Sequence, residues 1–269
     1  MPGTADKLLF IVKSLIQRPF SIRNLFDEEQ YHKLQLRKAN YSLKGFPQID
    51  MENVWGLVEN TVSEFLFLEG GSSILDLVLL QKVCSSIPNC HYLEIGTWRG
   101  ESAAAVAPYC KKVVTVNLGC DELKQAGMSD EYIKSQGFLS KNINHVEHIK
   151  ANSLEYDFEK LNSKFDVIFI DGDHHYESVV NDTKKLLPLL RNENSIMVWH
   201  DYGLSEERIR FTVYRGILDS FRNEMRSNLY HVANTKCAVY ANIQSIVKPL
   251  LAFNRPEKSF TVQLKSKKI

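Results

Sequence analysis

The feature that most constrains this chain is residues 91–107, HYLEIGTWRGESAAAVA, where an apolar run meets a glycine-bearing turn and then a run of small residues. Glu94, Gly96 and Gly100 form the pattern E-x-G-x-x-x-G, which is typical of the turn between a buried strand and a helix. Glycine adopts backbone angles that other residues avoid, and it lets a ligand come close to the backbone. The stretch therefore predicts a site for a nucleotide-like molecule at the carboxyl edge of a parallel sheet.

The spacing of this pattern differs from that of dinucleotide-binding chains. Those chains usually carry G-x-G-x-x-G, whose helix N-terminus receives a pyrophosphate. Here an acid, Glu94, stands two residues before the first glycine, where it would repel a pyrophosphate and attract a cationic amino-acid group. The alternative is an ordinary tight turn between strand and helix, without a ligand.

Length and charge narrow the class of protein. A chain of 269 residues with 44% hydrophobic side chains is long enough for one large α/β domain with additional elements. The formal net charge of +1 gives no global field toward nucleic acid or a membrane, so neither nucleic acid nor stable membrane insertion is expected. The five cysteines are odd in number and form no C-x-x-C pair, which favours reduced thiols in a cytoplasmic protein over disulfides or structural zinc. They are Cys84, Cys90, Cys110, Cys120 and Cys237.

From residue 91 onward, short apolar runs alternate with helical patterns. This rhythm predicts a doubly wound α/β fold with a mostly parallel sheet, closed by an antiparallel pair. We expect strands at 92–95, 112–117, 145–150, 165–170, 195–199, 230–232 and 237–240, and helices at 74–83, from 101 to near 108, within 121–140, at 176–190 and at 211–225.

The two ends of the chain have different patterns. Residues 1–70 read as an N-terminal helical extension, with amphipathic helices expected at 7–16 and 53–67. The first of these is expected to dock on the domain or on another subunit, a membrane surface being the alternative, and it favours a homo-oligomer. Residues 71–241 form the predicted ligand-binding domain. Residues 242–269 hold six Lys or Arg against one acid, which suggests a basic surface tail or an oligomer contact.

Right-handed crossovers place the carboxyl ends of parallel strands on one edge. Polar residues follow five of the predicted strands, so we expect them to gather along that edge. They lie at 94–100, 117, 152–153, 171–175 and 200–201.

Three blocks of sequence resemble the class I S-adenosylmethionine-dependent methyltransferases, which have a Rossmann-like fold. The blocks are LEIGTWRGESA (93–103), FDVIFIDGDHHYE (165–177) and IMVWHDYG (196–203). Within that class the chain looks most like small bacterial O-methyltransferases related to macrocin O-methyltransferase, which modify sugars of natural products. The resemblance implies S-adenosylmethionine as cofactor and methyl transfer to a hydroxyl of a small molecule, such as a sugar or natural-product glycoside.

The resemblance also implies a set of cofactor-binding residues. The turn at Gly96 and Gly100 would lie along the methionine portion, with Glu94 organising the turn or facing the cationic amino group. Asn117 stands where the family usually has an acid that holds both ribose hydroxyls. The full set is Glu94, Gly96, Thr97, Gly100, Ser102, Asn117, Asn152, Ser153 and Asp171.

In metal-dependent relatives, the first aspartate of the D-G-D block and two acids after the next strand hold a divalent cation. The matching residues here are Asp171, His200 and Asp201, with Mg²⁺ or Mn²⁺ as the expected ion. The imidazole at His200 favours softer ions than magnesium. Asp173 matches the position of the catalytic base, and His174 competes for that role because its intrinsic pKa lies near neutrality.

Plainer roles stand beside these. Asp171 and Asp173 would cap a helix, His174 would lie on the surface, and His200 would be a structural hydrogen-bonding group. Two other classes of function also remain. One is a nicotinamide-dependent oxidoreductase, and the other is a catalytically silent nucleoside-binding module.

Overall fold

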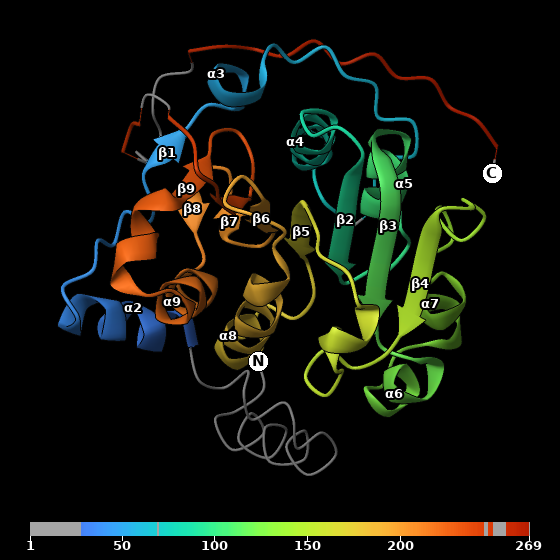
Figure 1. Ribbon diagram of the computed structural model, residues 1–269, viewed down its shortest axis with the longest axis horizontal. Coiled ribbons are helices and arrows are strands. Elements are labelled where there is room, and N and C mark those ends of the chain that lie inside the picture. Colours follow the sequence, from blue (N-terminus) through green and yellow to red (C-terminus); the bar gives the residue numbers. More distant parts are fainter. Residues whose placement is uncertain (1–27, 69, 245–246, 250–256, 269) are drawn as a thin grey trace, which may run out of the picture.

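The computed structural model describes residues 28–268 except 69, 245–246 and 250–256. Its centre is an eight-stranded sheet in which only β10 runs antiparallel to its neighbours (Figure 1). The expected doubly wound, mostly parallel sheet with an antiparallel closing strand is thereby confirmed. Across the sheet the order is β1 (Gln48–Ile49), β9 (Leu229–Val232), β10 (Ala238–Tyr240), β6 (Ile196–Trp199), β5 (Val167–Ile170), β2 (Cys90–Ile95), β3 (Cys110–Asn117) and β4 (Val146–Lys150).

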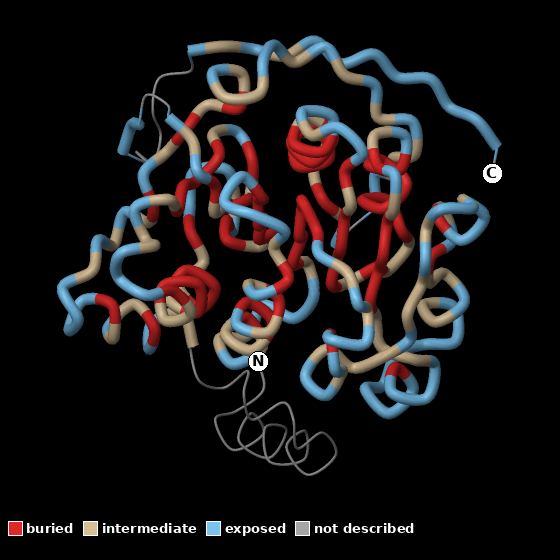
Figure 2. Tube along the Cα trace, in the orientation of Figure 1, coloured by how far each residue is buried: buried red, intermediate tan, exposed pale blue. Residues whose placement is uncertain are grey.

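Helices cover both faces of the sheet, which is why its central strands are apolar on both sides. Side chains alternate between the faces: Leu93 and Ile95 of β2 join one buried cluster, and Tyr92 joins the other. Figure 2 shows the buried residues concentrated along the central strands and the helices against them. One face is packed by α2 (Glu28–Lys38), α8 (Tyr176–Leu186) and α9 (Phe211–Ser220), and the other by α3 (Met51–Trp55), α4 (Ile74–Ser85) and α5 (Glu101–Val106).

Shorter elements complete the described chain. Two short helices, α6 (Cys120–Gln125) and α7 (Asp130–Lys134), follow β3 where one helix and a loop were expected. A hairpin of β7 (Gly203–Ser205) and β8 (Arg208–Ile209) follows β6. Short 3-10 helices lie at Ala107–Tyr109, Phe158–Leu161, Leu187–Leu189 and Asn223–Asn228.

The expected helix at 53–67 is wrong. Helix α3 ends at Trp55, Gly56 follows with φ of +82°, and residues 57–68, here called the strap, have no regular structure. The strap crosses α4, whose buried residues point in all directions and which therefore needs cover on its outer side as well. Val58 and Val62 of the strap pack against the cluster that contains α4.

The strap has no helical hydrogen bonds of its own. Side chains of α4 hold it through hydrogen bonds to its backbone instead. Gln81 Nε2 donates to Thr61 O at 3.0 Å, and Lys82 Nζ donates to Leu57 O at 2.8 Å. The apolar spacing that predicted a helix therefore marks an extended segment docked on one.

Other expectations at the two ends need correction or fall outside the structure. The helix expected at 211–225 ends at Ser220, and the following turn is a 3-10 helix. The N-terminal extension also contains a strand, β1, that joins the main sheet beside β9. The helix expected at 7–16 lies outside the described residues.

The described part of the basic tail lies along the strap, as Figure 1 shows. Lys258 Nζ lies 2.6 Å from Asp50 Oδ2 and 2.7 Å from Glu52 Oε2, and Lys267 pairs with Glu64. Charge pairs thus attach the tail to the N-terminal segment. In the described residues, no helix has the length and apolar character needed to cross a bilayer.

Candidate active site

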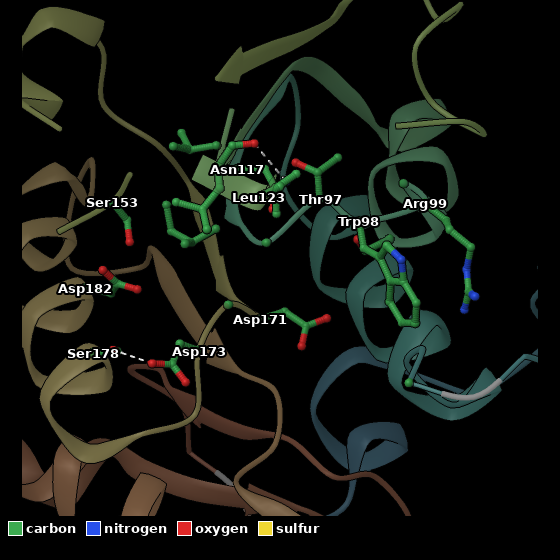
Figure 3. Close-up of a pocket in the computed structure, with 18 of the residues that line it drawn as sticks. Thr97, Trp98, Arg99, Asn117, Leu123, Ser153, Asp171, Asp173, Ser178 and Asp182 are labelled. Carbon is green, nitrogen blue, oxygen red and sulfur yellow. Dashed lines mark hydrogen bonds between the residues drawn. The ribbon is translucent and has the colours of Figure 1, made fainter. Parts of the chain in front are cut away.

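A cavity of about 470 Å³ opens at the carboxyl ends of β2, β3 and β5. Its volume lies within the range of about 300–1,000 Å³ that is usual for small-molecule sites. The crossovers place most of the sequence-predicted residues in its wall, and Figure 3 shows several of them around the open centre. Those in the wall are Gly96, Thr97, Gly100, Ser102, Asn117, Asn152, Ser153, Asp171, Asp173 and Asp201.

The glycines of the β2–α5 turn are required by the neighbouring backbone and side chains. Gly96 has φ of +95°, and a Cβ there would lie 2.0 Å from Asp171 O. Gly100 has φ of +80°, and a Cβ there would lie 2.1 Å from Ser140 Oγ. The sequence-based reason, close approach of a ligand, is therefore incomplete, because adjacent loops of the chain already occupy these spaces.

Thr97 is the clearest polar group in the wall without a protein partner. Its side chain is 3% exposed, and Oγ1 is buried with no hydrogen-bond partner. Leaving a buried hydroxyl unpaired costs about 1–3 kcal/mol. Because Thr97 lines the cavity, a bound molecule is the partner that would satisfy it.

Glu94 lies behind the wall rather than in it. Its Oε2 accepts hydrogen bonds from Ser102 Oγ at 2.8 Å and from Tyr92 OH at 2.9 Å, whereas Oε1 is buried without a partner. Burial raises the pKa of Glu94 to about 8, against the lowering effect of the two hydrogen bonds. Of its two expected roles, the geometry favours organising the turn, through Ser102 of α5.

The polar residues after β3 and β4 form the opposite part of the wall. Asn117 Nδ2 donates to Gln136 Oε1 at 2.6 Å, so α7 and its following turn orient this amide. Asn152 Oδ1 accepts from Leu154 N at 3.0 Å, which shapes the loop that presents Ser153. Both loops face the cavity.

Four residues form a charge cluster at the cavity: His200 and Asp76 are buried, and Asp171 and Asp201 are half-buried. His200, at the end of β6, places Nε2 at 3.2 Å from Asp76 Oδ2 and Nδ1 at 2.9 Å from Asp171 Oδ1. Nδ1 also lies 3.7 Å from Asp201 Oδ2. The contact with Asp76 has hydrogen-bond geometry, whereas Nδ1 has no hydrogen-bond partner by angle.

The charges in this cluster favour the ionised forms of His200, Asp76 and Asp201. Burial lowers the pKa of His200, but Asp171, Asp201 and Asp76 together raise it well above its usual value. Burial raises the pKa of Asp76 and Asp201, but His200 outweighs it and both pKa values fall to about 2. Burial raises the pKa of Asp171, and the adjacent imidazole only partly offsets this.

Asp76 is a site residue that sequence reasoning missed. It belongs to α4, the helix before β2, and it is fully buried. The signal was present, because Ser73 and Asp76 form the S-x-x-D pattern of a capping box, and the structure contains that box. The pattern predicts the cap, but only the fold brings it against His200.

Asp201 has a strained backbone. Its φ is +55°, in a region that non-glycine residues seldom adopt, and such strain concentrates at functional sites. Arg210 stabilises this conformation, with Nε donating to Asp201 O at 3.1 Å and Nη2 lying 3.5 Å from Oδ1. The arrangement keeps the carboxylate at the rim of the cavity, where it is in the wall.

The two candidate bases, Asp173 and His174, differ in their hydrogen bonds to the rest of the protein. Asp173 accepts from His175 N at 3.2 Å and from Ser178 Oγ at 2.7 Å, and it also pairs with His175 Nδ1. Although burial raises the pKa of Asp173, these hydrogen bonds lower it overall, so the carboxylate is a weak base. The expected helix cap at Asp173 is wrong, because His175 is the N-cap residue of α8 and no side chain caps that helix.

His174 lies outside the cavity wall, in a small adjoining hollow that it lines with His200 and Asp201. Part of its ring remains exposed. Partial desolvation and the charge of Arg210 nevertheless lower its pKa, which favours the neutral imidazole that can accept a proton.

Several other wall residues carry no sequence signature. Trp98 stacks on Tyr132 with ring centroids 5.6 Å apart, and the Arg99 guanidinium lies 3.9 Å from the Trp98 ring. A Cβ on Gly70 would lie 2.7 Å from Trp98, so the glycines before α4 allow this ring to seat. Asp182 of α8 is 1% exposed yet lines the cavity, and burial raises its pKa.

Comparisons with known proteins match this part of the chain. Residues 93–202 match a family model described as a methyltransferase domain. A curated relative, "Uncharacterized protein R132" of Acanthamoeba polyphaga mimivirus, is 32% identical over 117 residues, which is 41% of this chain and 51% of the relative. The match thus spans about half of that relative's length.

Two solved structures also resemble the chain. One is an O-methyltransferase from Bacillus cereus in complex with SAH, at 18% identity and TM-score 0.45, covering 65% of this chain and 84% of that one. The other is a putative caffeoyl-CoA O-methyltransferase from Staphylococcus aureus, at 22% identity and TM-score 0.44, covering 63% and 84%.

Proposed function

We propose that this chain, whose residues 93–202 match a methyltransferase-domain model, is a class I S-adenosylmethionine-dependent methyltransferase that binds its cofactor in the cavity and transfers the methyl group to a hydroxyl oxygen of a small molecule. The observation that carries the proposal is the cavity wall at the β2–α5 turn. There the buried Thr97 hydroxyl lacks a protein partner, inside the segment that matches the methyltransferase model.

The cofactor would lie across the carboxyl ends of β2 and β3. The backbone of the turn and Thr97 would contact its amino-acid portion, and Asn117 would hydrogen-bond the ribose. A neutral amide makes weaker hydrogen bonds than the carboxylate usual in the family, so Asn117 holds the ribose less tightly. Asn152 and Ser153 would border the adenine.

Asp171, His200 and Asp201 fit a divalent cation. Their ligand atoms lie within 4.8 Å of one another. Adjacent ligand atoms of an ion bound at about 2.1 Å lie roughly 3 Å apart, so small side-chain movements would bring the three residues to one ion. Asp76 takes the Nε2–H of His200, which directs Nδ1 toward the two carboxylates as in a carboxylate–histidine–metal arrangement. One nitrogen with two oxygens suits Mn²⁺ better than Mg²⁺.

A bound cation would supply charge that lowers the pKa of an acceptor hydroxyl. The chain's own groups orient and deprotonate that hydroxyl. Asp171 and Asp201 face the cavity from two adjacent strands, and Arg210 fixes Asp201. His174, whose lowered pKa favours the neutral imidazole, takes the hydroxyl proton, while Asp173 accepts from Ser178 in the first turn of α8. The acceptor class is a hydroxylated natural product such as a sugar or glycoside.

Calorimetry with S-adenosylhomocysteine and, separately, NADH tests the cofactor. We expect heat with the first and none with the second. Asn117→Ala should weaken S-adenosylhomocysteine by about 2- to 12-fold, the effect of one hydrogen bond. Asn142→Ala, an exposed asparagine outside the cavity wall, is the matched control and should bind like the parent. Heat with NADH alone would support the oxidoreductase alternative.

Methyl transfer is then measured as S-adenosylhomocysteine formed with a panel of hydroxylated acceptors, with Mn²⁺ or with EDTA. Turnover that rises with Mn²⁺ is expected. Tight cofactor binding without turnover on any acceptor, with and without metal, would support the silent binding module instead.

A further inference from the structure

Three cysteines meet at the amino-terminal edge of the sheet, at the opposite end of the strands from the cavity. Cys84 lies in the last turn of α4, Cys90 is the first residue of β2, and Cys110 is the first residue of β3. Their sulfur atoms lie within 4.8 Å of one another. The cluster therefore combines three soft ligands from segments 6 and 20 residues apart, a spacing that matches no sequence motif for metal.

Sheet register and helix packing create the cluster. Cys90 and Cys110 are direct partners between adjacent parallel strands, and the register shifts after Cys90. Helix α4 packs on the same face and brings Cys84 against the pair. The C-terminal end of a helix carries a partial negative charge, so a cation is favoured beside Cys84 in the last turn of α4.

The donors and their surroundings select the ion. Thiolates bind soft ions such as Cu(I). Zinc in a structural site takes four ligands, but among the described residues no histidine, carboxylate or fourth cysteine joins this group. The hydrophobic cluster that contains the three cysteines also includes Val83 and Val113. The charges of Asp166 and His91 act on Cys90, but neither side chain places a ligand atom within the group of three sulfurs.

The cluster is buried, yet it lies directly beneath the surface. Cys84 and Cys90 are 0% exposed and Cys110 is 9% exposed. Each is followed or preceded in sequence by an exposed residue, at positions 85, 89 and 111. Local opening of the turn between α4 and β2 would therefore admit an ion without unfolding the sheet.

We propose that Cys84, Cys90 and Cys110 form a three-sulfur binding site for Cu(I), separate from the cavity. Three sulfurs bound at about 2.3 Å to one ion in a plane lie about 4 Å apart, so the observed cluster needs little rearrangement. Each coordinating thiol gives its proton to solvent, and the ion keeps its oxidation state. The competing explanation is that the cysteines only pack as small apolar residues.

The full-length reduced protein is titrated anaerobically with Cu(I) against a chromophoric Cu(I) chelator, and X-ray absorption then identifies the donor atoms. We expect one ion per chain with an all-sulfur first shell of three atoms. Nitrogen or oxygen donors, no competition with the chelator, or a preference for Zn²⁺ over Cu(I) with four ligands would each overturn the proposal. This readout uses the parent protein, so it does not depend on any variant folding.

Variants assign the ion to the cluster. Cys90→Ser and Cys110→Ser should each lower Cu(I) affinity at least 100-fold, with far-ultraviolet circular dichroism reporting the fold. Cys120→Ser changes an exposed cysteine elsewhere and should bind like the parent. Equal loss in Cys120→Ser and the cluster variants, or no loss in the latter, would overturn the assignment.

Discussion

The carboxyl group of Glu94 makes folding stability depend on pH in a direction opposite to that of most acids. Its pKa is about 8 in the folded chain and 4.5 when unperturbed. Between these values the folded chain holds a proton that the unfolded chain has released. The free energy of unfolding therefore falls as pH rises, by about 1.4 kcal/mol per pH unit for this group.

Glu94→Gln removes this dependence and keeps the local contacts. A glutamine oxygen still accepts from Ser102 and Tyr92, and it cannot ionise. With the pKa in the unfolded chain at 4.5, the parent loses about 1 kcal/mol at pH 5 and about 3 kcal/mol at pH 7. The glutamine variant should therefore exceed the parent in stability by about 3 kcal/mol at pH 7, and roughly 2 kcal/mol of this advantage should appear between pH 5 and pH 7.

Urea denaturation of both proteins at pH 5, 6, 7 and 8, followed by tryptophan fluorescence, measures this difference. Ser102→Ala serves as the control, because it disturbs the same turn and leaves the carboxyl group able to ionise. A stability difference between Glu94→Gln and parent that is constant over this pH range would refute the reasoning. So would a parent that becomes more stable, relative to the variant, as pH rises.

Three further outcomes follow from the contacts described. Asp76→Asn should lower the free energy of unfolding by about 3–5 kcal/mol in urea titrations, because it removes the charge that pairs with the buried imidazolium of His200. The same change should weaken Mn²⁺ binding about 10- to 100-fold in calorimetry, because Asp76 orients the imidazole. In the parent, the rate of methyl transfer should rise with pH as His174 loses its proton, at a pKa lowered from the usual value of 6.5. His174→Gln should abolish this rise, whereas Asp173→Asn should keep it. The reverse result would make Asp173 the base. Glu101→Ala should speed limited proteolysis of residues 57–68 by about 10- to 100-fold, since it removes the carboxylate that accepts from Leu66 N at 2.9 Å; an unchanged cleavage rate would show that this bond does not hold the strap.

The sheet could be read from the sequence because its strands are short β-branched runs bounded by turns. The apolar run at 165–170 ends at an Asp-Gly turn, and the run that ends at Ile95 is followed by a turn with two glycines. A short apolar run bounded by such turn residues is typical of a buried strand. The strap could not be read in this way. Its apolar spacing fits a helix, but its hydrogen-bond partners include the side chains of Gln81, Lys82 and Glu101, which lie later in the chain.

The candidate site was predictable where it depends on strand ends. Asp171, His200 and Asp201 follow β5 and β6, so crossover handedness alone brings them to one edge. Asp76 and Asp182 come from helices, and their burial beside the site depends on how those helices pack. The cysteine cluster escaped prediction for the same reason, because its spacing has meaning only after β2 and β3 are paired.

Strand β1 makes the N-terminal segment part of the central sheet. It lies outside the matched domain in sequence, yet it covers the outer edge of β9 through parallel pairing at Gln48 and Ile49. Glu29 also accepts from the backbone of Phe211 and Thr212 at the start of α9. A chain trimmed to residues 71–241 would thus present an open β-edge and an uncapped helix, and it would self-associate through that edge.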